Sequence, residues 1–311
     1  MKFYSAPLQG LSESIWRNAH ESLFGGIDAY YTPFIRLEKN TLRHKDLREI
    51  SPENNAVEHL VPQIIASNAE TMRTLVSHIA SFGYSEININ MGCPFPPIAR
   101  KHQGAGILPF PKEVADLAKE IGKHPEIRFS VKMRLGMNAS NEWKAVLPIL
   151  NDTAITHIVL HPRIGKQQYE GEIDMNACTE FFNACKHPFI YNGDVKSIDD
   201  IKQIEQRFPE SEGIMVGRGL ISSPNLINDY LSGKISTKQQ DKEAVRKLHQ
   251  TLYSRFCETL EGGEKQILDK LKPYWEYFLP NMDRKARKGI LKATKMDKYL
   301  SAVEQALNSY E

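Results

Sequence analysis

Short apolar runs alternate with longer amphipathic stretches over the first two thirds of the chain. The short runs are rich in β-branched and aromatic side chains and are bounded by Gly, Pro, Asn and Asp, which is typical of buried strands. We therefore predict eight strands, at residues 2–6, 29–31, 60–65, 86–90, 128–133, 157–161, 189–192 and 213–216.

The stretches between these runs have the start signals of helices. Asn68 is a good N-cap for residues 68–82, and Ser197 is one for residues 197–208. Pro111 stands at the first helical position of residues 111–123. Eight strand–helix alternations predict the α/β class, with parallel strands closed into a TIM (β/α)8 barrel. A doubly wound open sheet is the alternative, but no GxGxxG motif follows the first strand.

The pattern changes around residues 232–240, which have the composition of a linker. Beyond them only helical periodicity is found, at residues 243–260, 264–278, 284–295 and 299–307. We predict a barrel domain at residues 1–235 and a small all-helical C-terminal domain at residues 236–311.

Composition narrows the class of protein. The chain has 311 residues, 41% of them hydrophobic, and a net charge of +2, so its total charge does not indicate nucleic-acid binding. Its four cysteines form no CxxC pair and stand at no metal-ligand spacing to histidine, so no metal site is predicted. A chain of this size without a signal peptide or an apolar run of about 20 residues predicts a cytoplasmic protein, and a monomer is the default.

Polar side chains stand at seven of the eight predicted strand ends. In a TIM barrel the active site lies at the C-terminal ends of the strands. The residues that this rule selects are Gln9, Gln63, Asn90, Cys93, Lys132, Arg134, His161, Arg163, Asn192, Gly193, Asp194, Gly217 and Arg218. Asn192-Gly193-Asp194 alone is typical of a plain turn, and His161 alone is equally compatible with a core histidine. Their shared position predicts a site.

The last two strand ends suit a phosphate group, because the loops after strands 7 and 8 often bind one in this fold. Gly193 and Gly217 allow close approach of the backbone, and Arg218 adds a planar cationic fork. Lys132 stands in an apolar strand, where a lysine is rare unless it is paired or functional.

Cys93 differs in context from the other cysteines. Free cysteine usually behaves as a small buried apolar residue, which is what we expect of Cys178, Cys185 and Cys257. Cys93 instead stands between Gly92 and Pro94 in a strand-to-loop turn, which predicts a thiol exposed at the barrel mouth. Residues 104–106, Gly-Ala-Gly, predict a mobile loop that could close over it.

Taken together, these motifs resemble those of the tRNA-dihydrouridine synthases over nearly the whole chain. The resemblance rests on Val61-Pro62-Gln63-Ile64, Asn90-Met91-Gly92-Cys93-Pro94, Val131-Lys132-Met133-Arg134-Leu135-Gly136, His161-Pro162-Arg163, Asn192-Gly193-Asp194 and Gly217-Arg218-Gly219. Many relatives have Gly-Arg-Thr after the histidine, whereas this chain has Pro162-Arg163-Ile164 and therefore no threonine at that place.

The resemblance implies reduction of a D-loop uridine in tRNA, with FMN as the cofactor and NADPH or NADH as the reductant. It implies that Cys93 is the general acid that protonates C5 of uracil. It assigns FMN binding to Pro7, Leu8, Gln9, Gln63, Lys132, His161, Asn192, Gly193, Asp194, Gly217 and Arg218. It assigns uracil contacts to Asn90 and Arg134, and the border of the pocket to Arg163 and Gln167. Residues 32–36 and 268–278 are closer to the subfamily that acts at position 16.

A basic run in the C-terminal region suits the RNA partner. Residues 282–298 carry seven Lys or Arg side chains and two acids, and Arg287 and Lys288 are the predicted backbone contacts. The alternatives are an FMN-dependent barrel oxidoreductase acting on a small molecule, of the dihydroorotate-dehydrogenase or ene-reductase kind, and an RNA-binding protein without catalysis. The first does not explain the basic run, and the second does not explain Cys93 and Lys132.

Overall fold

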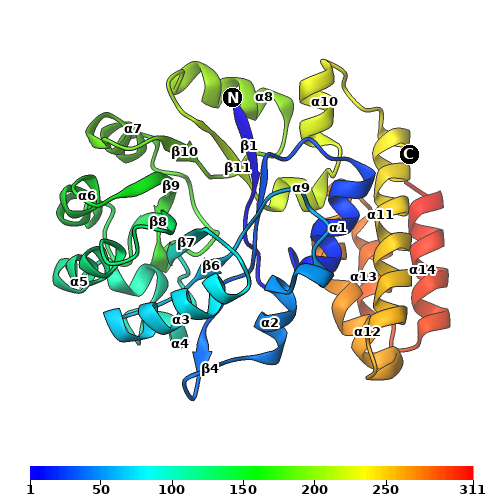
Figure 1. The fold of residues 1–311 in the computed structure, drawn as a ribbon. Helices are drawn as coiled ribbons and strands as arrows, with labels where there is room; N and C mark the ends of the chain where they lie inside the picture. Colours follow the sequence, from blue (N-terminus) through cyan, green and yellow to red (C-terminus); the bar gives the residue numbers. More distant parts are fainter. Residues whose placement is uncertain (311) are drawn as a thin grey trace.

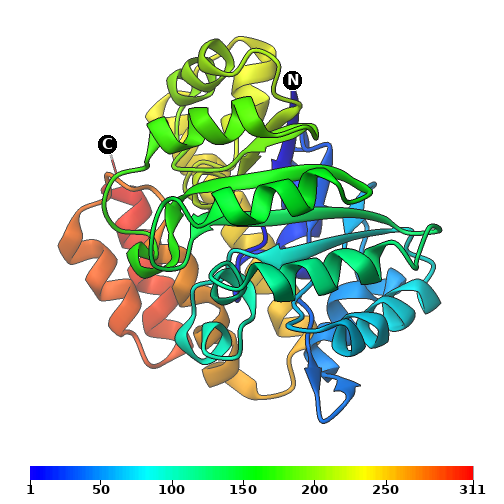
Figure 2. The ribbon, with the colours of Figure 1, turned by 90° about the vertical axis from the view of Figure 1, so that its left-hand side faces the viewer.

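The computed structural model, which describes residues 1–310, contains a closed ring of parallel strands. The order around the ring is β5-β2-β1-β11-β10-β9-β8-β7-β6, and every pair in it is parallel. The strands are β1 (Lys2–Ser5), β2 (Ala29–Tyr31), β5 (Leu60–Val61), β6 (Gln63–Ile64), β7 (Glu86–Met91), β8 (Arg128–Gly136), β9 (Ile155–Ile164), β10 (Phe189–Tyr191) and β11 (Gly213–Val216). The predicted TIM barrel is confirmed (Figure 1, Figure 2).

The third predicted strand is split by Pro62 into β5 and β6. β5 pairs with β2 on one side, and β6 pairs with β7 on the other, so these two short pieces close the ring. Proline has no backbone N–H to add to a ladder, so the strand is interrupted there. Its carbonyl still accepts from the Asn88 amide at 2.9 Å.

Helices form an outer layer around the ring (Figure 1, Figure 2). The longer ones are α1 (Ser14–Leu23), α2 (His44–Ile50), α3 (Ala69–Ser81), α5 (Pro111–Ile121), α6 (Trp143–Asn151), α7 (Met175–Ala184) and α8 (Ile198–Arg207). Two short helices lie at α4 (Pro96–Ala99) and α9 (Arg218–Ser222), and α10 (Leu226–Ser232) has the same length as α2. The predicted caps are confirmed: Asn68 accepts from the Thr71 amide, and Ser197 forms a capping box with Asp200.

A small hairpin, β3 (Leu37–Glu38) with β4 (Thr41–Leu42), projects from the barrel and was not predicted (Figure 1). Its two turn residues, Lys39 and Asn40, have φ of 50° and 63°. A type I′ hairpin turn places both of its central residues in this left-handed region. Lys-Asn is not a strong signal for that turn, so the sequence pattern did not indicate it.

The barrel has two separate layers of apolar packing. Inside the ring a small cluster fills the lower part, formed by Tyr4, Ala6, Ala29, Tyr31, Val61, Val159, Ile190 and Met215. Outside the ring a much larger cluster joins strands to helices and continues into the C-terminal helices. The inner cluster ends where polar side chains begin, so the upper part of the ring is available for chemistry.

The C-terminal helices stand together on one side of the barrel, with α11 packed along α1 (Figure 1). They are α11 (Lys238–Thr259), α12 (Gly263–Leu271), α13 (Arg284–Lys292) and α14 (Met296–Asn308). The predicted helix 264–278 was too long: α12 ends at Leu271, and residues 272–276 form a 3-10 turn that contains Pro273. Likewise, the helix predicted at 284–295 ends at Lys292.

Specific polar contacts tie this helical region to the barrel. The buried Tyr274 hydroxyl donates to the Leu11 carbonyl at 2.6 Å, and Lys270 pairs with Glu13. Since the packed core is continuous across this junction, the two-domain division at residue 235 stays a prediction. Within residues 1–310, no helix has the length and apolar character needed to cross a membrane.

Candidate active site

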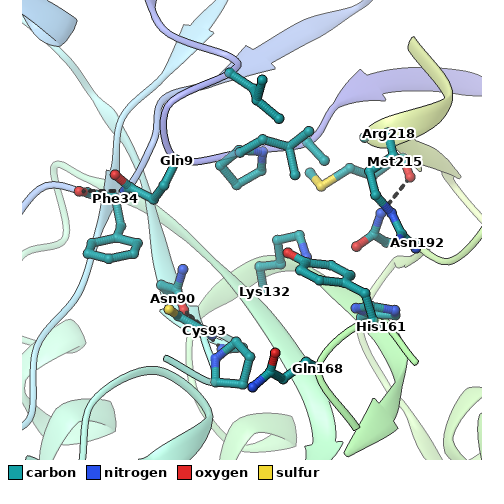
Figure 3. A pocket seen from close by; sticks show the side chains of 18 of the residues that line it. Gln9, Phe34, Asn90, Cys93, Lys132, His161, Gln168, Asn192, Met215 and Arg218 are labelled. Carbon is teal, nitrogen blue, oxygen red and sulfur yellow. Dashed lines mark hydrogen bonds between the residues drawn. The ribbon is translucent and has the colours of Figure 1, made fainter. Parts of the chain in front are cut away.

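One cavity of about 590 Å³ opens at the C-terminal ends of the strands. Figure 3 shows Asn90, Cys93, Lys132, His161, Asn192 and Arg218 around one space, although they come from five different strand ends. The predicted residues that line it are Pro7, Leu8, Gln9, Asn90, Cys93, Lys132, Arg134, His161, Asn192, Gly193, Asp194, Gly217 and Arg218. The strand-end rule therefore located one site from residues spread over more than 200 positions.

Strand register explains why these side chains meet. Asn90 of β7 pairs with Lys132 of β8, and Arg134 of β8 pairs with His161 of β9. Alternate residues of a strand point to the same face, so Lys132 and Arg134 both point into the ring. The sequence shows the spacing within one strand. Only the pairing between strands places the side chains of β7, β8 and β9 at the same height in the ring.

A turn organised by Asn90 holds Cys93 at the end of β7. The Asn90 side-chain oxygen accepts from the backbone amides of Gly92 at 3.0 Å and Cys93 at 2.8 Å. The Arg134 Nε donates to the Gly92 carbonyl at 3.0 Å, which holds the same turn from β8. Asn90 was predicted to orient the substrate. In this structure its oxygen positions the cysteine backbone.

Buried amides continue this arrangement below the cavity. Asn90 donates to the Gln63 side-chain oxygen at 2.7 Å, and Gln63 donates to Asn88 at 2.8 Å. Asn88 in turn donates to the Ser130 hydroxyl at 2.8 Å. Gln63 is 1% exposed and does not line the cavity, so its predicted direct contact with a cofactor receives no support from its position. Its side chain instead orients Asn90.

Residues 104–106 were predicted to form a mobile loop, and that prediction was wrong. They lie in a 3-10 turn (Gly104–Ile107) in which all four residues are buried. The Ala105 amide donates to the Cys93 carbonyl at 2.9 Å. A Cβ at Gly104 would collide with Cys93, and one at Gly106 would collide with Ala99. Glycine is needed here for close packing, which makes this turn a rigid support for the cysteine.

Arg163 and Gln167 were predicted to border the pocket, but neither lines it. Arg163 is buried and donates to Asp194 at 2.5 Å and to the Gly171 carbonyl at 2.7 Å. Gln167 accepts from the Ile164 amide and so closes the turn after β9. Both side chains are used to shape the loop that carries Tyr169.

Burial decides the charge state of Cys93. Loss of solvent raises the pKa of its thiol, and this effect exceeds the lowering by the Phe95 amide and by the positive charges of Arg134 and Lys132. A thiol whose pKa is raised above its ordinary value keeps its proton at neutral pH. Cys93 is therefore able to donate a proton, which is the opposite of an activated thiolate nucleophile.

Lys132 is a cation at the cavity wall whose pKa is strongly lowered. Burial, with a further contribution from nearby Arg134, lowers its pKa to about 7. No hydrogen bond or ion pair to Lys132 is found in residues 1–310. Burial also lowers the pKa of Arg134 to about 10. Cations crowded without an anion between them favour binding of a negatively charged or electron-rich ligand.

Asp194 balances part of this positive charge. One carboxylate oxygen accepts from Arg163 at 2.5 Å and the other from Arg218 at 2.6 Å. Burial would raise the pKa of Asp194, but the two guanidinium groups outweigh it and hold the pKa below its usual value. His161 accepts from Arg163 through Nε2, and burial lowers its pKa well below the ordinary value, so it is neutral.

Several cavity residues were missed by the sequence analysis. Tyr169 lies between two cations, with Arg218 4.6 Å and Arg134 5.5 Å from its ring centroid. Tyr277 reaches the cavity from the C-terminal region, and Phe95 from the loop after Cys93. Tyr277 is far in sequence from any strand end, and Tyr169 and Phe95 belong to loops in which no motif was recognised. The sequence pattern therefore did not identify any of the three as a site residue.

The basic run of the C-terminal region divides into two kinds of residue. Lys288 is exposed on α13, and its RNA contact stays a prediction. Arg287 is half-buried and donates to the carbonyls of Trp275 and Leu279, at 2.8 Å for Leu279. Leu279 has a φ of 47°, so Arg287 holds a strained turn. Its guanidinium is committed to the fold, which weakens its predicted role as an RNA contact.

The other cysteines follow expectation in part. Cys178 is buried, as predicted, and burial raises the pKa of its thiol to about 12. Cys185 is half-buried at the end of α7, and Cys257 is exposed on α11, so the prediction that Cys257 is buried was wrong. On an amphipathic helix a single cysteine can fall on either face, and its residue type alone does not say which.

Comparison with known proteins identifies the fold and the relatives of this site. A family model described as dihydrouridine synthase matches residues 4–310. A tRNA-dihydrouridine(16) synthase of Neisseria meningitidis serogroup B is 26% identical over 280 residues, which are 86% of this chain and 83% of that protein. The tRNA-dihydrouridine(16) synthase of Aquipseudomonas alcaligenes is 24% identical over 78% of each chain.

Among solved structures, the old yellow enzyme of Trypanosoma cruzi superposes with a TM-score of 0.56 at 8% identity, over 79% of this chain and 92% of that one. Morphinone reductase gives a TM-score of 0.54 at 8% identity, over 75% and 86%. At such low identity these two comparisons support the barrel fold alone.

The pKa of Lys132 leads to a prediction for the ligand-free protein. The unfolded chain keeps this proton up to about pH 10.5, while the folded protein releases it near pH 7. The folded state therefore gains stability from this group as the pH rises from 7 to 10. We expect Lys132→Met to stabilise the protein most at pH 7 and below, with the difference shrinking towards pH 10 in urea unfolding.

The matched control is Lys202→Met, at an exposed position on α8. This variant shows how much the loss of an exposed lysine by itself changes the free energy of unfolding at each pH. A pH-independent difference for Lys132→Met would show that Lys132 keeps its proton in the folded state.

Proposed function

Because this chain belongs to the dihydrouridine synthase family, we propose that it reduces the uridine at position 16 of the tRNA D-loop to dihydrouridine. The proposal includes FMN as the cofactor, NADPH or NADH as the reductant, and Cys93 as the general acid. The observation that carries it is the meeting of a protonated, half-buried thiol and an unpaired Lys132 at one cavity. Position 16 rests on the names of the two relatives.

The cavity suits a flavin in its shape and donor set. Gly217 and Gly219 let the backbone pass closely: a Cβ at Gly217 would lie 3.2 Å from the Ala6 Cβ, and one at Gly219 would collide with the Val195 carbonyl. Gly193, Gly217 and Arg218 would hold the phosphate after strands β10 and β11. Asn192 is oriented for this by donating to the Met215 carbonyl at 2.7 Å.

Lys132 would lie beside the electron-rich edge of the bound ring and stabilise negative charge there. A bound flavin would supply hydride transfer, first from the dinucleotide and then to C6 of uracil. Desolvation holds the pKa of Lys132 near neutrality when no anion is present, so a negatively charged partner in the cavity would favour its charged form.

Cys93 would complete the reduction by giving its proton to C5. The hydride at C6 breaks the C5–C6 π bond and leaves the electron pair on C5 and O4, so a positioned acid is required. The Sγ–H bond breaks as the C5–H bond forms, and the resulting thiolate would regain a proton from solvent. Arg134 and Lys132, which both lower the pKa of Cys93, would stabilise that thiolate.

The RNA must present its base outside the stacked loop, at a cost of a few kcal/mol. We propose that exposed cations of α13 bind the phosphate backbone beside the barrel mouth. Arg284, Lys285, Lys288 and Lys292 are exposed, and among the described residues none of the four has a hydrogen-bond or ion-pair partner. Tyr277 connects this region to the cavity wall.

We also propose that the protein acts in the cytoplasm and as a monomer.

The alternative, a flavin-dependent reductase of a small molecule, would use the same phosphate loops and the same lysine. It leaves the exposed cations of α13 without a role, and the family model covers the C-terminal region as well as the barrel.

The function is tested with the flavin-loaded protein and unmodified tRNA. We expect NADPH oxidation to depend on the tRNA and nucleoside analysis to detect dihydrouridine. A transcript with cytidine at position 16 should accept no reduction. Reduction of that transcript would contradict the position but keep the activity, whereas tRNA-independent oxidation of NADPH with no dihydrouridine would contradict the activity itself.

Removal of the proton donor tests the chemistry. Cys93→Ala should keep bound flavin and its reduction by NADPH, but dihydrouridine formation should fall about 100-fold or more, because general acids contribute at least that much. Cys257→Ala is the control, since Cys257 is exposed on α11. Dihydrouridine formation by Cys93→Ala within a few-fold of the parent rate would rule out the acid role.

Charge reversal tests the RNA surface. Lys285→Glu with Lys288→Glu should weaken tRNA binding and reduce the slope of log affinity against log salt by about one for each phosphate that the variant no longer neutralises. Arg287 is left intact, because its change would break the bonds to Trp275 and Leu279. Unchanged affinity and salt slope would place the RNA on another surface.

A further inference from the structure

Phe95 is an exposed aromatic side chain at the wall of the proposed active site. It is 58% exposed, lines the same cavity as Cys93, and follows it by two residues. No other aromatic ring contacts it among the described residues. A single exposed apolar side chain is common and needs no explanation by itself. The loop that carries Phe95 and the charges beside it indicate what this ring could bind.

The backbone around Phe95 is rigid, so the ring is held out of the core. Pro94 and Pro96 fix φ on both sides. The Phe95 carbonyl accepts from the amides of Ile98 and Ala99, both at 2.9 Å, and caps the short helix α4. The buried turn Gly104–Ile107 supports this loop from behind. These contacts hold the backbone of Phe95 at the cavity wall, where its ring is exposed.

Two unpaired cations follow Phe95 on the same loop. Arg100 and Lys101 are exposed, and within residues 1–310 neither has a hydrogen-bond or ion-pair partner. A rigid aromatic face with free cations beside it is the combination that single-stranded nucleic acid recognises, through base stacking and phosphate contact. A small apolar ligand would gain nothing from the cations.

We propose that Phe95 stacks against a nucleobase next to the uridine that enters the cavity, while Arg100 and Lys101 contact the adjoining phosphates. This inference rests on the proposed function, because it needs an unstacked RNA strand at the barrel mouth. Stacking on Phe95 offsets part of the stacking that the neighbouring base loses when the uridine leaves the loop. Phe95 touches no reacting atom and acts on RNA binding alone.

The test separates binding from chemistry in the flavin-loaded protein. Phe95→Ala should raise KM for unmodified tRNA about tenfold or more, as expected when one base is no longer stacked. Its kcat and the rate of flavin reduction by NADPH should stay within about twofold of the parent. Phe95→Trp should restore KM, because any flat aromatic ring can stack. Phe110→Ala is the control, since Phe110 is 38% exposed and stacks on His102 at 3.8 Å.

An independent pair of variants tests the phosphate contacts. Arg100→Glu with Lys101→Glu should raise KM for tRNA and flatten its salt dependence, while Lys202→Glu on α8 should not. The proposal is overturned if KM of Phe95→Ala lies within about twofold of the parent, or if Phe95→Trp is impaired as much as Phe95→Ala. Absence of dihydrouridine with the parent protein would instead contradict the proposed function, so the two failures are distinct.

Discussion

The closure of parallel strands into a ring is the constraint on which the rest of this structure depends. Parallel pairing sends every C-terminal strand end to the same mouth, so residues from β1 to β11 share one cavity. The ring closes where Pro62 divides one strand into two pieces of two residues each. The Pro62 carbonyl and the Gln63 side chain both bond to Asn88 of β7, so the strand that leads to Cys93 is joined to this interruption and to β6 after it.

Within that cavity, burial and positive charge have opposite effects on the pKa of Cys93 and the same effect on the pKa of Lys132. Burial raises the pKa of Cys93, so its thiol keeps its proton at neutral pH, and burial lowers the pKa of Lys132 to about 7, so this amine titrates near neutral pH. Asp194 pairs with Arg163 and Arg218 and leaves Lys132 and Arg134 without an anion. The site is therefore electrostatically incomplete in the protein alone. Such a site suits a cofactor with a phosphate group and an electron-rich ring.

Much of the site was accessible from the sequence because strand ends are easy to recognise. Lys132 in an apolar run and Cys93 between Gly92 and Pro94 both marked positions that line the cavity. Gln63 and Arg163 were marked by the same rule and lie beneath the cavity or behind it. Residue type and strand position do not show whether a polar side chain reaches the open space or is already satisfied by a buried neighbour.

The sequence by itself determined the barrel, the strand ends and the chemical identity of the groups there, because alternation and turn residues are local signals. Only the tertiary structure decided three further points. It placed the Gly104–Ile107 turn tightly behind Cys93, it committed Arg287 to two backbone carbonyls, and it left Phe95 exposed beside the thiol. Each of these depends on packing between segments that are distant in the chain or on the path of one loop. The periodic spacing of apolar residues in the sequence predicts neither of these.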